Sequence, residues 1–204
     1  TGCPVANKYQ IGSAVSQTAY ISHHTAMEYY GVCDQVYYDV YVSSETPFKE
    51  FEFDGYTYCY VASKCKLGIE NVHYSGGVRI TDKERTTLDS IKDMDKISGI
   101  EEVLANIDGF TSLNEEKLTG YLQEYHNQFL YQKTGFILYP YRDKLGLSHS
   151  FFEMCQSKTG KSKRYLTKEF TNGTYIKEWK LVVPDEIYKL KNGAFQDDRM
   201  DLCQ

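Results

Sequence analysis

The stretch that decides the fold is Phe51-Glu-Phe-Asp-Gly-Tyr-Thr-Tyr-Cys-Tyr60. Aromatic side chains alternate along it on both sides of Asp54-Gly55, and this dipeptide between alternating residues is the strongest short-range signal for a β-hairpin. The preceding residues 36–42 are β-branched and aromatic, as is typical of a strand. A second hairpin is expected around Ser75-Gly76-Gly77. Residues 36–92 therefore predict an antiparallel β-meander that is followed by one helix.

Helical signals lie on both sides of the strands. Ser22 is a suitable N-cap for a helix that ends at Gly31, because serine favours the first position of a helix and glycine the stop. A shorter helix is expected over residues 6–15. Thr81-Asp-Lys-Glu84 has the spacing of a capping box, and it predicts a helix that continues through Ile91.

The second half of the chain is expected to be mainly helical. Residues 96–158 carry apolar side chains at i, i+3, i+4 and i+7, as in the group from Ile100 to Ile107. A strand over residues 175–183, stopped by Pro184, is expected to close the chain.

This order of elements predicts an α+β fold. Its parts are N-terminal helices, an antiparallel β-meander, a helical bundle and a C-terminal strand that returns to the sheet. We expect residues 1–95 to form an α/β-meander lobe and residues 96–204 a helical lobe with the closing strand, both within one integrated domain.

The composition excludes several classes of protein. Hydrophobic residues make up 41% of the 204 residues and charged ones 25%, which is typical of a globular chain and argues against disorder. The net charge of −5 disfavours a general nucleic-acid binder, which would usually be basic. No apolar stretch approaches the length of a membrane span, and residues 1–10 lack the pattern of a signal peptide. We therefore expect a cytoplasmic protein with no membrane partner.

A search for chemistry in the sequence predicts no catalytic residue, no metal and no cofactor. The six cysteines have irregular spacing and are expected to be reduced thiols, and the five histidines are not near them at zinc-site spacing. The segment Cys155–Ser162 ends like a phosphate-binding loop but lacks its first glycine and the strand before it. Gly12-Ser13 is not followed by the two closely spaced aspartates of a nucleotidyltransferase.

Two segments have both a structural and a functional interpretation. Arg85 and Asp89 are four residues apart on the helix that Glu84 helps to cap, so they can form an internal ion pair or contact a partner. The second segment is a cluster of basic residues with no acid until Glu169, either a solvated face or a surface for DNA or for self-contact. Its members are Lys158, Lys161, Lys163, Arg164 and Lys168.

Four segments in this order resemble the AbiEi family, which are antitoxins and transcriptional autoregulators of abortive-infection type IV toxin–antitoxin systems. They are Tyr20-Ile-Ser-His-His-Thr-Ala-Met-Glu-Tyr-Tyr-Gly31, Phe51-Glu-Phe-Asp-Gly55, Val78-Arg-Ile-Thr-Asp-Lys-Glu-Arg-Thr-Thr-Leu-Asp89 and Glu178-Trp-Lys-Leu-Val-Val183. A fifth family segment is matched by Asn127, Leu130, Gln132 and Gly135. The resemblance extends over residues 6–190.

The resemblance implies a non-catalytic role. The family's residues with structural or interaction roles correspond here to Ser22, His23, Tyr30, Gly31, Glu84, Arg85, Thr86, Asp89 and Trp179. The implied partners are a cognate nucleotidyltransferase-like toxin, neutralised with or without a stable complex, and operator DNA. Because the family normally begins with a winged helix-turn-helix that binds the operator, we expect this chain to be the C-terminal domain alone.

Two other function classes stay open at the level of the sequence. One is a metal-dependent nuclease or other nucleotide-processing enzyme. The other is a protein-interaction module outside toxin–antitoxin systems, which would use part of its 19 tyrosines as an aromatic docking surface.

Overall fold

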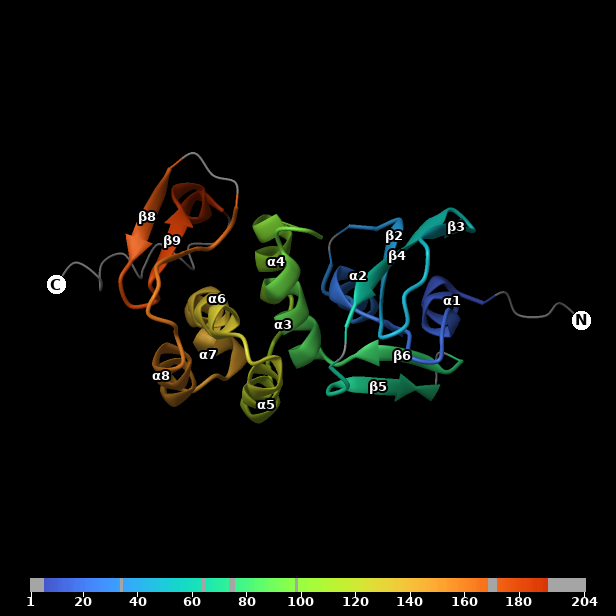
Figure 1. Cartoon of the computed structure of the whole chain (residues 1–204), viewed down its shortest axis with the longest axis horizontal. Helices are drawn as coiled ribbons and strands as arrows, with labels where there is room; N and C mark the ends of the chain where they lie inside the picture. The colour runs from blue at the N-terminus through green and yellow to red at the C-terminus, as the bar shows by residue number, and fades with distance from the viewer. Residues whose placement is uncertain are drawn as a thin grey trace, which may run out of the picture. The chain divides into compact units, whose positions relative to one another are not determined.

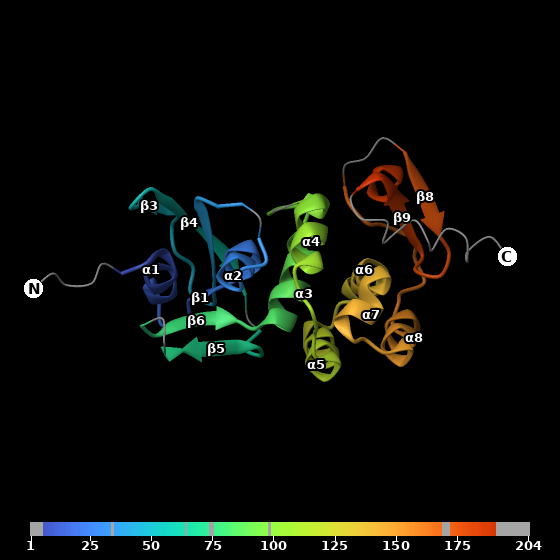
Figure 2. The same ribbon diagram turned by 180° about the vertical axis from the view of Figure 1, so that it is seen from behind.

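The structure is a computed structural model that describes residues 6–33, 35–63, 65–73, 76–97, 99–168 and 172–190. The chain divides into two compact units, Thr1–Asp89 and Ser90–Gln204. Unit 1 holds a mixed sheet with helices beside it, and unit 2 holds a group of helices and a small sheet (Figures 1 and 2). The predicted α+β class is therefore confirmed.

The sheet of unit 1 has six strands in the order β3-β4-β2-β1-β6-β5. The strands are β1 (Tyr20–Ile21), β2 (Asp39–Ser44), β3 (Phe51–Phe53), β4 (Tyr56–Ala62), β5 (Ile69–Val72) and β6 (Val78–Thr81). Both predicted hairpins are present as the antiparallel pairs β3–β4 and β5–β6. The turn of the second hairpin includes Ser75, which lies outside the described residues.

The prediction of an antiparallel meander is wrong for the strand pairs outside the two hairpins. Strand β2 is parallel to β4, and β1 is parallel to β6, so the sheet is mixed. The reason is the position of β3: the chain leaves β2, passes to the sheet edge to form β3, and returns as β4 between β3 and β2. Alternation of side chains fixes which face of a strand is buried but carries no information on which neighbour the strand takes.

The core of unit 1 lies between the sheet and two helices, α1 (Lys8–Ala14) and α2 (His23–Tyr29). Helix α1 packs against β1, β2 and β6, and α2 against β2. Gly12 permits the close approach of α1, because a Cβ atom there would lie 2.7 Å from Ile21. The buried apolar residues of this core are Ala19, Ile21, Ala26, Val40, Val42, Tyr58, Val78 and Ile80.

Tyr58 is the polar exception in this core. Its side chain is fully buried and its ring stacks on that of Phe51 at a centroid distance of 4.7 Å. The hydroxyl has no hydrogen-bond partner within the described part of the chain. We therefore expect Tyr58→Phe to raise the free energy of unfolding by about 1 kcal/mol, because a buried hydroxyl without a partner costs more than it contributes. Urea denaturation measures this change.

The matched control for Tyr58 is Tyr20. Its buried hydroxyl donates to Ser63 Oγ at 2.7 Å and accepts from Arg85 Nη2 at 3.3 Å. Tyr20→Phe removes the same atom but breaks both bonds, so it is expected to lower the stability by about 1 kcal/mol. Equal effects of the two substitutions would contradict the assignment of the hydroxyl groups.

The helices of unit 2 lie within the segment predicted to be helical. They are α4 (Gly99–Asp108), α5 (Glu115–Tyr125), α6 (Gln128–Leu138), α7 (Arg142–Leu145) and α8 (His149–Ser157). Helix α6 is buried from Leu130 to Leu138 on all its faces and packs against α8. Helix α3 (Lys83–Asp93) crosses the boundary between the units in the sequence. No helix in the described part of the chain is long and apolar enough to cross a bilayer.

The last strands form a separate sheet. Its order is β7-β9-β8, with β7 (Arg164–Tyr165), β8 (Gly173–Ile176) and β9 (Leu181–Pro184). The predicted single strand over 175–183 is therefore wrong, and so is its return to the first sheet. A turn at Lys177–Lys180, closed by a bond from Lys180 N to Lys177 O, splits the segment into two antiparallel strands.

Tyr141 in unit 2 is expected to make the free energy of unfolding fall as the pH rises above 10. It is 6% exposed, and burial raises its pKa from 10.0 to about 12. Above pH 10 the unfolded chain releases this proton before the folded chain does, so Tyr141's contribution is lost as the pH rises toward 12. We expect the urea midpoint to fall less steeply over this interval in Tyr141→Phe. Parallel falls in the two proteins would contradict the prediction.

Candidate functional site

Arg85 on α3 binds several groups of unit 1 through its side chain. It is fully buried, and its Nε donates to both carboxylate oxygens of Asp89 at 3.1 and 3.0 Å. Its Nη atoms reach loop and strand groups that come from elsewhere in the sequence. These acceptors are Leu67 O at 2.6 Å, Cys65 Sγ at 2.9 Å, Ser63 Oγ at 3.2 Å and Tyr20 OH at 3.3 Å.

Burial favours the structural interpretation of the Arg85–Asp89 pair. The side chains are 0% and 2% exposed, and the acceptors of Arg85 named above belong to unit 1. A partner cannot reach either group without opening the core. The pair therefore joins α3 to β1 and to the segment that follows β4, which is a structural role.

The resemblance residues around α2 are also in the interior. Ser22 is at the N-cap position, but its side chain makes no cap bond. Its Oγ lies 2.7 Å from Ser43 Oγ and 2.8 Å from Nδ1 of the buried His23. Tyr30, which ends α2, donates its hydroxyl proton to Thr81 O at 2.8 Å.

The remaining resemblance residues of unit 1 complete this arrangement. Gly31 follows α2 with a φ of +71°, a conformation that favours glycine. Thr86 Oγ1 lies 2.7 Å from Thr81 Oγ1, and Glu84 is buried. The predicted capping box is displaced by one residue: Asp82 caps α3, since its Oδ1 accepts from Arg85 N at 2.8 Å. Thr81 cannot cap because it pairs in β6.

Trp179 and the fifth family segment meet in unit 2. Asn127 caps α6 by accepting from the backbone N–H groups of residues 129 and 130. One turn further, the buried Gln132 donates from Nε2 to Trp179 O at 3.1 Å. Gly135 lies against the indole, because a Cβ atom there would be 2.0 Å from Trp179 Cζ3. Residues more than 40 positions apart in the sequence thus form one buried contact.

The predicted basic residues are all exposed and belong to several different elements of unit 2. Lys158 is the C-cap of α8, and the Arg164 guanidinium lies 5.8 Å from the centre of the Phe129 ring. Lys161 lies in the turn before β7, Lys163 contacts two tyrosines of the small sheet, and Lys168 lies beside a pocket. None of the five makes an ion pair with any residue that the structure describes, whereas elsewhere Lys8, Lys133 and Lys144 each pair with an acid.

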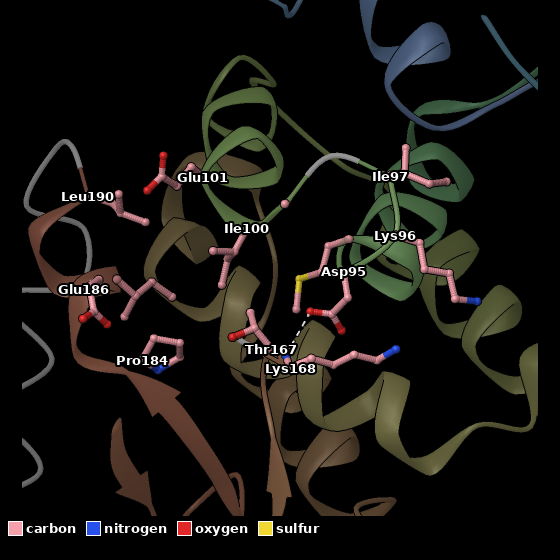
Figure 3. A pocket seen from close by; sticks show the side chains of 13 residues that line it. Asp95, Lys96, Ile97, Ile100, Glu101, Thr167, Lys168, Pro184, Glu186 and Leu190 are labelled. Carbon is pink, nitrogen blue, oxygen red and sulfur yellow. Dashed lines mark hydrogen bonds between the residues drawn. The ribbon is translucent and has the colours of Figure 1, made fainter. Parts of the chain in front are cut away.

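The pocket beside Lys168 has a volume of about 580 Å³ and lies wholly in unit 2. Figure 3 shows Lys96 and Lys168 on one side of it, and Glu101 and Glu186 on the other. The apolar residues of the lining are Met94, Ile97, Ile100, Pro184, Ile187 and Leu190. The pocket therefore has two lysines with Asp95 on one side and two glutamates on the other (Figure 3).

Asp95 at the pocket wall is held in place by two donors. Its Oδ1 accepts from Lys168 N at 3.3 Å, and its Oδ2 from Lys133 Nζ at 3.4 Å. Lys133 is 4% exposed in its side chain, and burial lowers its pKa although Asp95 opposes the shift. No group of three acidic, histidine or cysteine side chains in the described ranges is arranged to hold a metal ion.

Sequence reasoning missed several of these residues. Asp95 and Lys133 are 38 positions apart, and nothing in their local patterns pairs them. Tyr165 and Tyr175 were not singled out as a surface, because β7 is only two residues long and shows no alternating pattern in the sequence.

Comparison with known proteins supports the fold and goes no further. No family model matches the sequence, and no curated protein does. The structure is similar to the crystal structure of the RV2827C protein from Mycobacterium tuberculosis, with a TM-score of 0.61 and 13% sequence identity. The match covers 81% of this chain and 62% of that protein, so the chain spans less than two thirds of its length.

Proposed function

We propose that the chain is the antitoxin domain of an AbiEi-like transcriptional autoregulator. In this role it neutralises a nucleotidyltransferase-like toxin in the cytoplasm, without catalysis, and supports operator binding by the winged helix that this family carries at its N-terminus. The observation that carries the proposal is the contact of Gly135 and Gln132 with Trp179.

Residues that match the family by their order in the sequence also lie close together in the structure. A chance resemblance would scatter such residues over the core and the surface. Instead, Gly135, Gln132 and Trp179 meet at one buried point of unit 2. Arg85, Thr86, Ser22 and His23 are likewise buried in unit 1, whereas Tyr30 is half-buried and Gly31 is exposed.

The same burial favours a non-catalytic role. Three of the ionisable resemblance residues, Arg85, Asp89 and His23, have less than 3% of their side chain or residue surface exposed. The contacts described above for these residues are made within unit 1. The domain would then act through its surface, as an antitoxin does when it binds a toxin or an operator complex.

The test is co-expression of the full-length protein with any nucleotidyltransferase-like toxin that is encoded beside it. We expect growth to be restored when both are produced, and the operator to be repressed only by the full-length protein. A toxin variant without activity is the control for growth. Failure of the soluble, folded full-length protein to restore growth would overturn the proposal.

A further inference from the structure

The small sheet of unit 2 carries two exposed tyrosines in one row. Tyr165 on β7 and Tyr175 on β8 both lie opposite Val182 on the central strand β9. Side chains at paired positions of neighbouring strands project from the same face. Tyr165 is 54% exposed and Tyr175 is 45% exposed, while Val182 between them is 5% exposed. The two rings therefore form an aromatic surface above an apolar strand.

A cation lies next to both rings. Lys163 Nζ is 5.9 Å from the ring centre of Tyr165 and 5.3 Å from that of Tyr175. Within the described residues Lys163 has no ion pair, and its ammonium makes cation–π contacts with the two rings. We call Lys163, Tyr165 and Tyr175 the tyrosine platform.

We propose that the tyrosine platform binds single-stranded nucleic acid. The tyrosine rings would stack on unpaired bases, and the Lys163 ammonium would move from the rings to a phosphate. Aromatic side chains combined with cations are the common means by which proteins bind single strands without reading a sequence. The proposal does not depend on the antitoxin function.

The chemistry favours a single strand over a duplex. In a duplex each base is already stacked and its faces are covered, so two tyrosine rings could meet only the backbone. In a single strand the faces of the bases are open to an aromatic ring. Neighbouring strands are about 4.8 Å apart, which separates the two rings by roughly twice that distance and leaves room for each to take its own base.

Two further lysines lie in the loop before β7 or bind to it. Lys161 is exposed and makes no ion pair within the described part of the chain. Lys180, directly before β9, donates from Nζ to Gly160 O at 3.1 Å and to Thr159 Oγ1 at 3.3 Å, which ties this loop to the sheet. The whole chain carries a net charge of −5, but positive charge is concentrated beside the two tyrosine rings. A phosphate backbone would therefore be attracted to this part of the surface.

The experiment measures binding of the purified chain to fluorescein-labelled 12-residue oligonucleotides by anisotropy at low salt. The probes are single-stranded RNA, single-stranded DNA of the same sequence, and the duplex. We expect both single strands to bind more tightly than the duplex, and a difference between RNA and DNA would show that the ribose hydroxyl is also contacted. Tyr165→Ala with Tyr175→Ala should weaken binding by a factor of about ten or more.

Two further variants separate stacking from charge. Lys163→Gln should weaken binding a few-fold and reduce the salt dependence by about one charge. Tyr38→Ala is the matched control, because Tyr38 is 68% exposed but belongs to unit 1, whereas the platform belongs to unit 2. It should leave binding unchanged, and circular dichroism confirms that all variants are folded.

The proposal is overturned by either of two results. One is no binding of single strands by the folded chain. The other is binding that the double tyrosine variant retains. If that variant binds no differently from the native protein but fails to restore growth against the toxin, the platform is instead a protein-docking surface. Because the binding assay contains no toxin, its failure leaves the antitoxin function to be judged by growth alone.

Discussion

Replacing Arg85 by methionine is expected to lower the free energy of unfolding of unit 1 by about 3–5 kcal/mol. The substitution removes a fully buried guanidinium and leaves the Asp89 carboxylate, 2% exposed, without its cation. It also removes the donors to Leu67 O and Ser63 Oγ, so that the segment after β4 loses these side-chain bonds to α3. A buried charge that has lost its partner is among the most destabilising defects that one substitution can create.

The measurement combines urea denaturation with hydrogen exchange, because two compact units need not unfold together. Exchange should accelerate in β1, β4 and α3 and change little in α5 to α8. The double variant Arg85→Met/Asp89→Leu should recover part of the loss, since no charge is then left buried. Lys66→Ala is the control: its ion pair with Glu45 spans 3.2 Å but is exposed, and its loss should cost less than about 1 kcal/mol. An Arg85→Met protein as stable as the control variant would refute the structural role of the pair.

Local signals in the sequence predicted local structure well. Asp54-Gly55 gave the correct hairpin because two residues with positive φ, +52° and +77°, form its turn. The helices of unit 2 followed from apolar spacing in the same way. The parallel pairing of β2 with β4 could not be predicted, because it depends on a chain crossover that leaves no pattern within either strand.

The contacts of the candidate site could not be predicted from local patterns either. The sequence shows the stretch of basic residues but not which neighbour each of them contacts. Lys163 lies over the tyrosines, whereas Arg164 lies near Phe129. Adjacent residues of a strand project to opposite faces, and β7 is only two residues long, too short to be recognised from alternation. The tyrosine platform forms only when β9 pairs with strands on both sides.

Gly135→Ala in helix α6 is the second substitution with a large expected effect. In an open helix this change is favourable by about 1 kcal/mol, because alanine is the better helix former. At this position the new Cβ would lie 2.0 Å from Cζ3 and 2.3 Å from Cη2 of Trp179, whose side chain is buried with 5% exposed, so the ring itself would have to shift. We expect overpacking to prevail and to lower the stability of unit 2 by about 1–3 kcal/mol.

Gly120 in helix α5 is the matched control for this substitution. It is also a helical glycine of unit 2, but a Cβ atom there would have no neighbour within 4 Å. Gly120→Ala should therefore raise the stability by up to about 1 kcal/mol, so the same chemical change has opposite signs in two helices of one unit. Trp179→Phe should relieve part of the cost of Gly135→Ala, since the smaller ring withdraws the clashing atoms, and a double-mutant cycle measures this coupling. If Gly135→Ala were as favourable as Gly120→Ala, the contact with Trp179 would not hold the unit together, and the spatial agreement on which the proposed function depends would fail with it.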